Sequence, residues 1–136
     1  MGLRSGKGEN MPLAFSTPNL PRRAGNVLIV TGTIVASGNY STGGDTLDLS
    51  QIPGLPTDLA PDNVDIVSVA TPNSGWEYGF VKGASLANGK MQVFGQQPTS
   101  ASAGVIVLSE LAAGAYPASI TGDVISVILT FLNFGQ

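Results

Sequence analysis

The chain has 136 residues, of which 43% are hydrophobic and only 11% are charged. Ordinary soluble domains carry about 25% charged residues, so this surface relies on neutral polar side chains or is covered by partners. The chain contains no cysteine and no histidine, which excludes disulfides and thiolate metal sites and removes the commonest metal ligand and general base.

Residues 1–25 are predicted to form an extended N-terminal arm, because glycine and proline recur there without any sustained hydrophobic period. The first 23 residues carry a net charge of +3, whereas the remainder carries −6. Such an asymmetry favours an arm that lies on an acidic neighbour, and four scattered cations are too few for a nucleic-acid tail. The predicted partner-binding residues of the arm are Leu13, Phe15, Leu20, Arg22 and Arg23.

Residues 26–136 are predicted to form one β domain. Residues 26–37 are rich in β-branched side chains, and residues 46–49 follow a glycine-rich turn. Residues 50–62 contain three prolines and are expected to be a loop. The further predicted strands, separated by turns, are residues 64–71, a hairpin within 75–95, residues 105–111 and residues 124–134.

The last predicted strand is apolar on both faces. One face carries Ile125, Val127, Leu129 and Phe131, and the other carries Val124, Ile128, Leu132 and Phe134. A strand that is apolar on both faces is normally buried on both faces. In a two-layer fold only one of them meets the core, so Ile128, Leu132 and Phe134 are predicted to meet another subunit or a covering segment.

These short strands with Gly/Pro turns predict an all-β fold, a β-sandwich or a jelly-roll-like barrel. No apolar run approaches the ~18 residues that a membrane-spanning helix needs. We therefore expect no membrane association.

Candidate chemical sites are sparse. Asp45 and Asp48 flank a glycine-rich turn, and Asp58, Asp62 and Asp65 follow, so a calcium ion near either group remains open although the spacing matches no known calcium loop. Without histidine, no nucleophile-and-base spacing stands out. We predict no enzymatic activity and no cofactor.

An aromatic row forms the basis of an alternative function. Trp76, Tyr78 and Phe80 alternate along one strand, and such rows can stack sugars or bases. The same alternation is typical of a strand with one face in a core, which is the favoured interpretation.

A resemblance extends over roughly residues 27–135. Residues 32–49 are similar to the start of small β-sandwich proteins of tailed bacteriophages, with Tyr40, a Thr42-Gly43-Gly44-Asp45 turn, and Leu47 and Leu49. The later features follow in the same order as in those proteins: an aromatic strand, an Asn-Gly-Lys turn, a Ser/Thr/Ala loop and a terminal strand that ends in Phe-Gly.

The resemblance implies a capsid decoration (cement) protein. It would bind the outer capsid surface and stabilise contacts between major capsid proteins as a homo-oligomer, with a trimer expected. Its location would be the virion, after synthesis in the host cytoplasm. The alternative is a head-fibre, tail-associated or carbohydrate-binding β-sandwich module that uses Trp76 and Tyr78.

Overall fold

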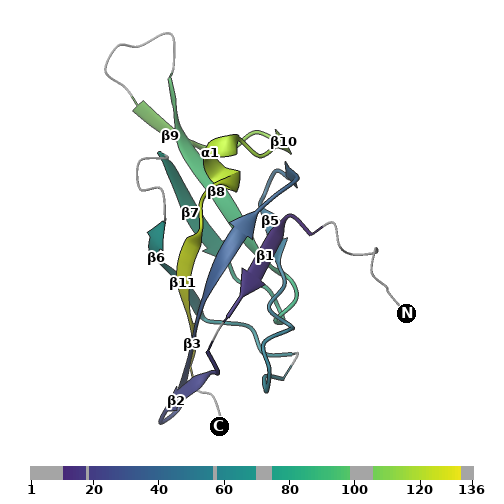
Figure 1. Ribbon diagram of the computed structural model, residues 1–136, viewed down its shortest axis with the longest axis vertical. Coiled ribbons are helices and arrows are strands. Elements are labelled where there is room, and N and C mark those ends of the chain that lie inside the picture. The colour runs from purple at the N-terminus through teal and green to yellow at the C-terminus, as the bar shows by residue number, and fades with distance from the viewer. Residues whose placement is uncertain (1–10, 18, 57, 70–74, 99–105, 133–136) are drawn as a thin grey trace, which may run out of the picture.

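The described part of the chain folds mainly into β-strands, with almost no helix (Figure 1). The computed structural model describes residues 11–17, 19–56, 58–69, 75–98 and 106–132. Within them the strands form two larger sheets and one small two-stranded sheet, and the single helical turn is α1 (Ala118–Thr121). The predicted all-β class is confirmed, and within the described residues the sheets do not close into a barrel.

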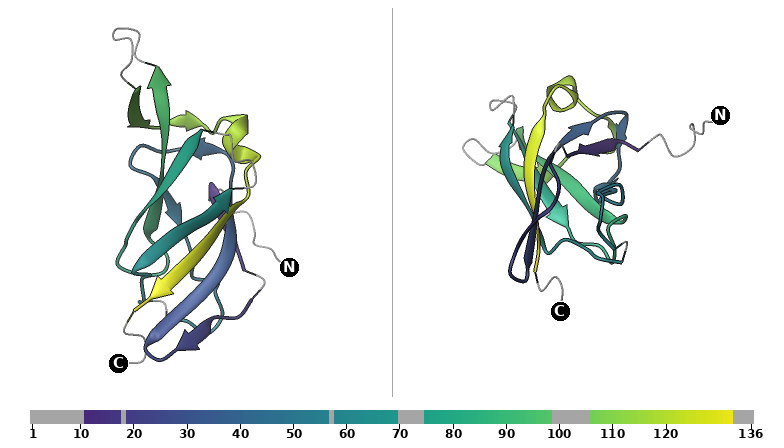
Figure 2. Two further views of the ribbon diagram at one scale, coloured as in Figure 1. Left: turned by 90° about the vertical axis from the view of Figure 1, so that its left-hand side faces the viewer. Right: turned by 60° about the horizontal axis from the view of Figure 1, so that its bottom comes forward.

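The first sheet has five strands, with β11 at its centre between β3 and β6 (Figure 2, left). Both β1 and β2 pair antiparallel with β3, on the side that β11 does not occupy. The strands of this sheet are β1 (Leu13–Ser16), β2 (Arg22–Ala24), β3 (Val27–Ala36), β6 (Asn63–Val69) and β11 (Ile125–Phe131).

The second sheet is built around β8, which pairs with β5, β7 and β9. Its strands are β5 (Asp45–Leu47), β7 (Trp76–Val81), β8 (Gly89–Pro98) and β9 (Ile106–Glu110). The small sheet pairs β4 (Asn39–Tyr40) with β10 (Gly114–Ala115).

Both larger sheets contribute to one hydrophobic core. Val30, Ile34 and Leu129 of the first sheet and Met91 and Val93 of the second are at most 1% exposed and belong to the same cluster. The burial pattern of β11 alternates strictly, with its odd-numbered residues facing the core. The even-numbered residues of β11 therefore lie on the outer face of the first sheet, as strand geometry requires.

The prediction of an extended arm over residues 1–25 does not hold for residues 13–16 and 22–24, which form β1 and β2 of the first sheet. β1 pairs with the C-terminal part of β3, so Leu13 and Phe15 are buried in the core, with exposed fractions of 3% and 6%. β2 lies along the same edge and pairs with the N-terminal part of β3. Residues 1–10 lie outside the described part of the chain.

Candidate interaction surface

The five residues predicted to bind a partner separate into two groups. Leu13 and Phe15 are core residues, so they are not anchors for another subunit. Leu20 is 73% exposed, and Arg22 and Arg23 lie exposed on β2, with Arg23 donating a hydrogen bond from Nε to the Gly25 carbonyl at 3.0 Å. The surface group thus lies at one edge of the first sheet.

The predicted second face of the last strand is present on the outside of this sheet. Ile128 is half-buried there, and Leu132, directly after β11, is 49% exposed. Phe134 lies outside the described residues.

The two central strands of the first sheet carry no charged residue at all. On the outer face the pairing places Thr33 beside Ser126, Thr31 beside Ile128, and Ile29 beside Thr130. Apolar side chains stand at both ends of these rows: Val35 and Val124 at one end, Val27 and Leu132 at the other. We call these ten residues, which lie on β3, on β11 or directly next to β11, the outer face.

Exposed apolar side chains gather around the outer face. Seven large hydrophobic residues are exposed in the described part of the chain, and five belong to the first sheet or to segments that border it. Those five are Leu20, Val35, Val67, Val124 and Leu132, whereas Val81 and Leu108 lie on the second sheet. Exposed large apolar side chains that gather on one side of a domain favour an interaction site there.

Opposite charges stand at the two edges of the outer face. Arg22 on β2 is the register partner of Ile29, so its side chain emerges on the outer side. Asp65 on β6 is the register partner of Ile128 on the opposite side, and its Oδ1 accepts a hydrogen bond from Asn63 Nδ2 at 2.7 Å. The edges are therefore basic on the β2 side and acidic on the β6 side.

A shallow hollow of about 400 Å³ lies at the basic edge, lined by Asn19, Leu20, Pro21, Arg22 and Thr31. Its wall is held in place by hydrogen bonds to β3. Thr17 Oγ1 donates to the Thr31 carbonyl at 2.6 Å, and Asn19 Nδ2 donates to Thr31 Oγ1 at 3.3 Å. Thr17 and Asn19, which lie close to the exposed Leu20 in the sequence, are thus attached to β3.

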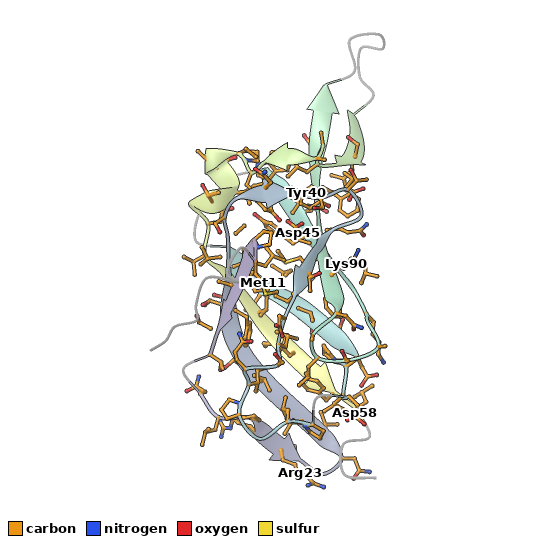
Figure 3. The ribbon with its side chains drawn as sticks, turned by 90° about the vertical axis from the view of Figure 1, so that its right-hand side faces the viewer. Met11, Arg23, Tyr40, Asp45, Asp58 and Lys90 are labelled. Atoms are coloured by element: carbon orange, nitrogen blue, oxygen red, sulfur yellow. The ribbon has the colours of Figure 1, made fainter. Side chains whose placement is uncertain are left out.

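A cluster of tyrosines and carboxylates lies at the other end of the molecule from Arg23 (Figure 3). The Tyr40 hydroxyl and the Gly43 amide both donate to Glu110 Oε2 at 2.6 Å. The Tyr116 hydroxyl donates to Asp45 Oδ2 at 2.6 Å, and the Ser41 amide donates to Asp45 Oδ1 at 3.1 Å. We call Tyr40, Asp45, Glu110 and Tyr116 the tyrosine–carboxylate cluster.

This cluster fixes the turn between β4 and β5, which contains the motif that carries the resemblance. Burial, followed by the hydrogen bond to Glu110, raises the pKa of Tyr40 to about 12. Burial, followed by the hydrogen bond to Asp45, raises the pKa of Tyr116 above its ordinary value. Because these carboxylates already accept hydrogen bonds from donors within the chain, we interpret the cluster as a structural network.

Several carboxylates at the predicted calcium positions also accept hydrogen bonds from within the chain. Both oxygens of Asp45 accept hydrogen bonds, and Asp48 Oδ1 accepts from the amide and hydroxyl of Ser50 at 2.9 and 2.6 Å. Asp62 accepts from Lys82 Nζ and from the Leu132 amide, each at 2.7 Å, while Asp58 is exposed. Among the described residues, no group of three or more potential ligands could hold a metal ion.

The aromatic row is also engaged by its own domain. The Trp76 ring covers Gly95 on β8, where an added Cβ would collide with it, and Trp76 Nε1 donates to Ser119 Oγ at 2.9 Å. The Tyr78 hydroxyl donates to Asp123 Oδ2 at 3.1 Å, and burial raises the Tyr78 pKa. A sugar-stacking platform needs open ring faces, so this arrangement gives the carbohydrate alternative no support.

Comparison with known proteins adds no relative. No protein-family model matches the chain, and neither curated proteins nor solved structures give a match. Among the described residues, no helix has the length and hydropathy to span a membrane.

Proposed function

We propose that this chain is a structural, non-enzymatic protein that works by burying the outer face against other protein subunits. The carrying observation is that the outer face has no charge on its two central strands and that five of the seven exposed large hydrophobic residues in the described part of the chain lie on it or next to it. An exposed sheet face without charge is unusual for a free surface, and protein interfaces are depleted of charge at their centres.

The setting we propose is the outer surface of a tailed-bacteriophage capsid, where the protein stabilises contacts between major capsid proteins. What supports this setting is the resemblance, whose turn motif contributes Tyr40, Gly43 and Asp45 to the tyrosine–carboxylate cluster or its hydrogen bonds. The trimer that the resemblance implies remains a prediction for the shell-bound state. Each contact made by such an oligomer gains from being tethered to the others.

The first test is the copy number of the chain in purified particles relative to the most abundant shell protein. A ratio near one, or a simple fraction of it, supports decoration of the whole capsid surface. Absence from particles would refute the virion setting.

A variant tests the outer face directly. Ile128→Lys puts a charge at the centre of the face, on a half-buried side chain that points away from the core. We expect the variant to fold with nearly unchanged stability and to lose most of its incorporation into particles, because an unpaired charge at an interface centre costs several kcal/mol. Incorporation is measured by quantitative gel or mass spectrometry of particles.

Val81→Lys is the matched control. Val81 is 45% exposed and lies on β7 of the second sheet. Equal incorporation of both variants and the wild type would show that incorporation into particles does not depend on the outer face.

A further inference from the structure

The outer face has a pattern that matches itself under a twofold rotation. We propose that the partner that covers it is a second copy of this chain, with the twofold axis parallel to the strands and between β3 and β11. This inference rests on the proposed function only in taking the outer face to be a protein-binding surface. It adds the identity of the partner and the orientation of the contact.

Such an axis exchanges the two central strands without shifting them along their length. Each outer residue of β3 then faces the β11 residue of its own row in the second copy, so Thr33 faces Ser126, and Thr31 faces Ile128. In the third row Ile29 faces Thr130, so one row pairs two hydroxyl side chains and the other two rows pair a threonine with an isoleucine. Two sheets packed in this way lie about 10 Å apart with nearly aligned strands.

The charges at the sheet edges select this axis. The rotation places the β2 edge of one copy over the β6 edge of the other, so Arg22 comes over Asp65 of the second copy, and the pair occurs twice. Arg22 lies in the row of Ile29 and Asp65 in the row of Ile128, one same-face step of about 7 Å apart along the strand. The long arginine side chain spans such an offset.

The alternative axis, across the strands, is disfavoured by the same charges. It would place each edge over the same edge of the second copy, so the acidic β6 edges would face each other. Electrostatic matching across an interface fixes orientation in this way. An isologous contact closes on two copies, so it gives a dimer, or joins two trimers if a threefold contact forms elsewhere.

The test is the mass of the purified full-length protein by sedimentation equilibrium over a wide concentration range. We expect two chains, or six. Arg22→Glu and Asp65→Arg, made separately, should each raise the dissociation constant of the twofold contact roughly ten- to hundredfold, because two attractive pairs become repulsive. Combining both changes in one chain should restore association.

Mixing the two single variants gives a sharper readout. In a mixed dimer one contact pairs the Arg22→Glu chain with the Asp65→Arg position of the other chain, and the second contact pairs two unaltered residues. The mixture should therefore associate nearly as tightly as the wild type, although each variant alone does not. Lys90→Glu and Glu77→Arg, exposed positions on the second sheet, are the charge-matched controls and should leave the mass unchanged.

Several outcomes would overturn the inference. They are a wild-type mass of one chain, a mass of three chains, or association that is indifferent to both charge reversals. None of these bears on the copy number of the protein in particles, so the proposed function can survive them. Conversely, a charge-sensitive dimer in a protein that particles lack would retain the twofold contact and refute the virion setting.

Discussion

Single side chains hold the turn between β4 and β5 in place. Tyr40 is 2% exposed and Tyr116 is 6% exposed, and their rings meet edge to face with centroids 5.6 Å apart. A buried hydroxyl without a partner is costly, so each phenol donates to a carboxylate. The Tyr40 oxygen also accepts a hydrogen bond from the Val93 amide at 3.2 Å, which ties the turn to the second sheet.

The raised phenol pKa values predict sensitivity to base. Unfolded tyrosine ionises near pH 10, whereas the pKa of Tyr40 in the folded protein is raised to about 12. Between these values the unfolded state loses the proton and the folded state keeps it, so stability is complete below pH 10 and falls as pH rises toward 12. Tyr40 alone accounts for on the order of 2–3 kcal/mol of this loss. Urea unfolding at successive pH values measures it.

Tyr40→Phe is the control for the alkaline effect. It lacks the ionising group, so its stability should be lower at neutral pH and should decline less steeply above pH 10. Parallel declines in the two proteins would mean that Tyr40 does not govern the alkaline transition.

At the scale of the element, aromatic rings cover glycines on neighbouring strands. Phe15 of β1 covers Gly32 of β3, Phe80 covers Gly89, and Trp76 covers Gly95. Glycine weakens a strand, and a ring laid over it recovers packing. The Phe15 contact attaches β1 to the sheet.

Gly32→Ala tests that attachment. Its Cβ would lie 2.5 Å from Phe15 Cζ and 2.6 Å from the Ser16 carbonyl oxygen, and the backbone oxygen cannot rotate away. We expect a loss of about 1–3 kcal/mol in the free energy of unfolding, measured by denaturant titration.

Gly79→Ala is the matched change, because its Cβ would lie 3.8 Å from Phe94, in ordinary contact. It should be neutral or slightly stabilising, since alanine restricts the unfolded chain. Equal losses at the two positions would indicate a general intolerance of the sheets and no special role for the Phe15 contact.

At the scale of the molecule, local patterns predicted the longer strands of residues 26–136 but neither the partners of these strands nor β1 and β2. The predicted strand of residues 26–37 matches β3 (Val27–Ala36), and the apolar second face of the last strand was visible from its alternation. The pairing of β1 with β3 was missed, because its four residues sit among glycines and prolines and gain their burial only from a strand some 20 residues away. Burial of that kind is not encoded locally.

The same reason limits what the sequence could say about the interaction surface. Arg22 was predicted to be a partner-binding residue of a free arm, and Asp65 was considered only as a calcium ligand. Their placement at opposite edges of one face follows from the strand order β3–β11–β6 and the attachment of β2 to β3. The tyrosine–carboxylate cluster likewise joins residues about 70 positions apart.

The corrected role of residues 11–16 leads to a truncation experiment. Deleting residues 1–10 retains Leu13 and Phe15 in the core and the hydrogen bond from the Ser37 amide to the Pro12 carbonyl at 2.7 Å. We expect this variant to keep the wild-type free energy of unfolding. Deletion through Ser16 removes two large buried side chains, which should cost roughly 3–6 kcal/mol, measured by thermal and urea unfolding.

The longer deletion should also change how the protein associates. Removing β1 leaves the backbone groups on one side of the C-terminal part of β3 unpaired, and such an open edge promotes aggregation. A free arm would give the opposite result, because a chain without residues 1–16 would then retain its stability and lose only partner binding. The free energies of unfolding of the two deletion variants therefore show whether residues 11–16 are a strand of the domain or an arm that binds a partner. Equal stability of the two variants would support the arm.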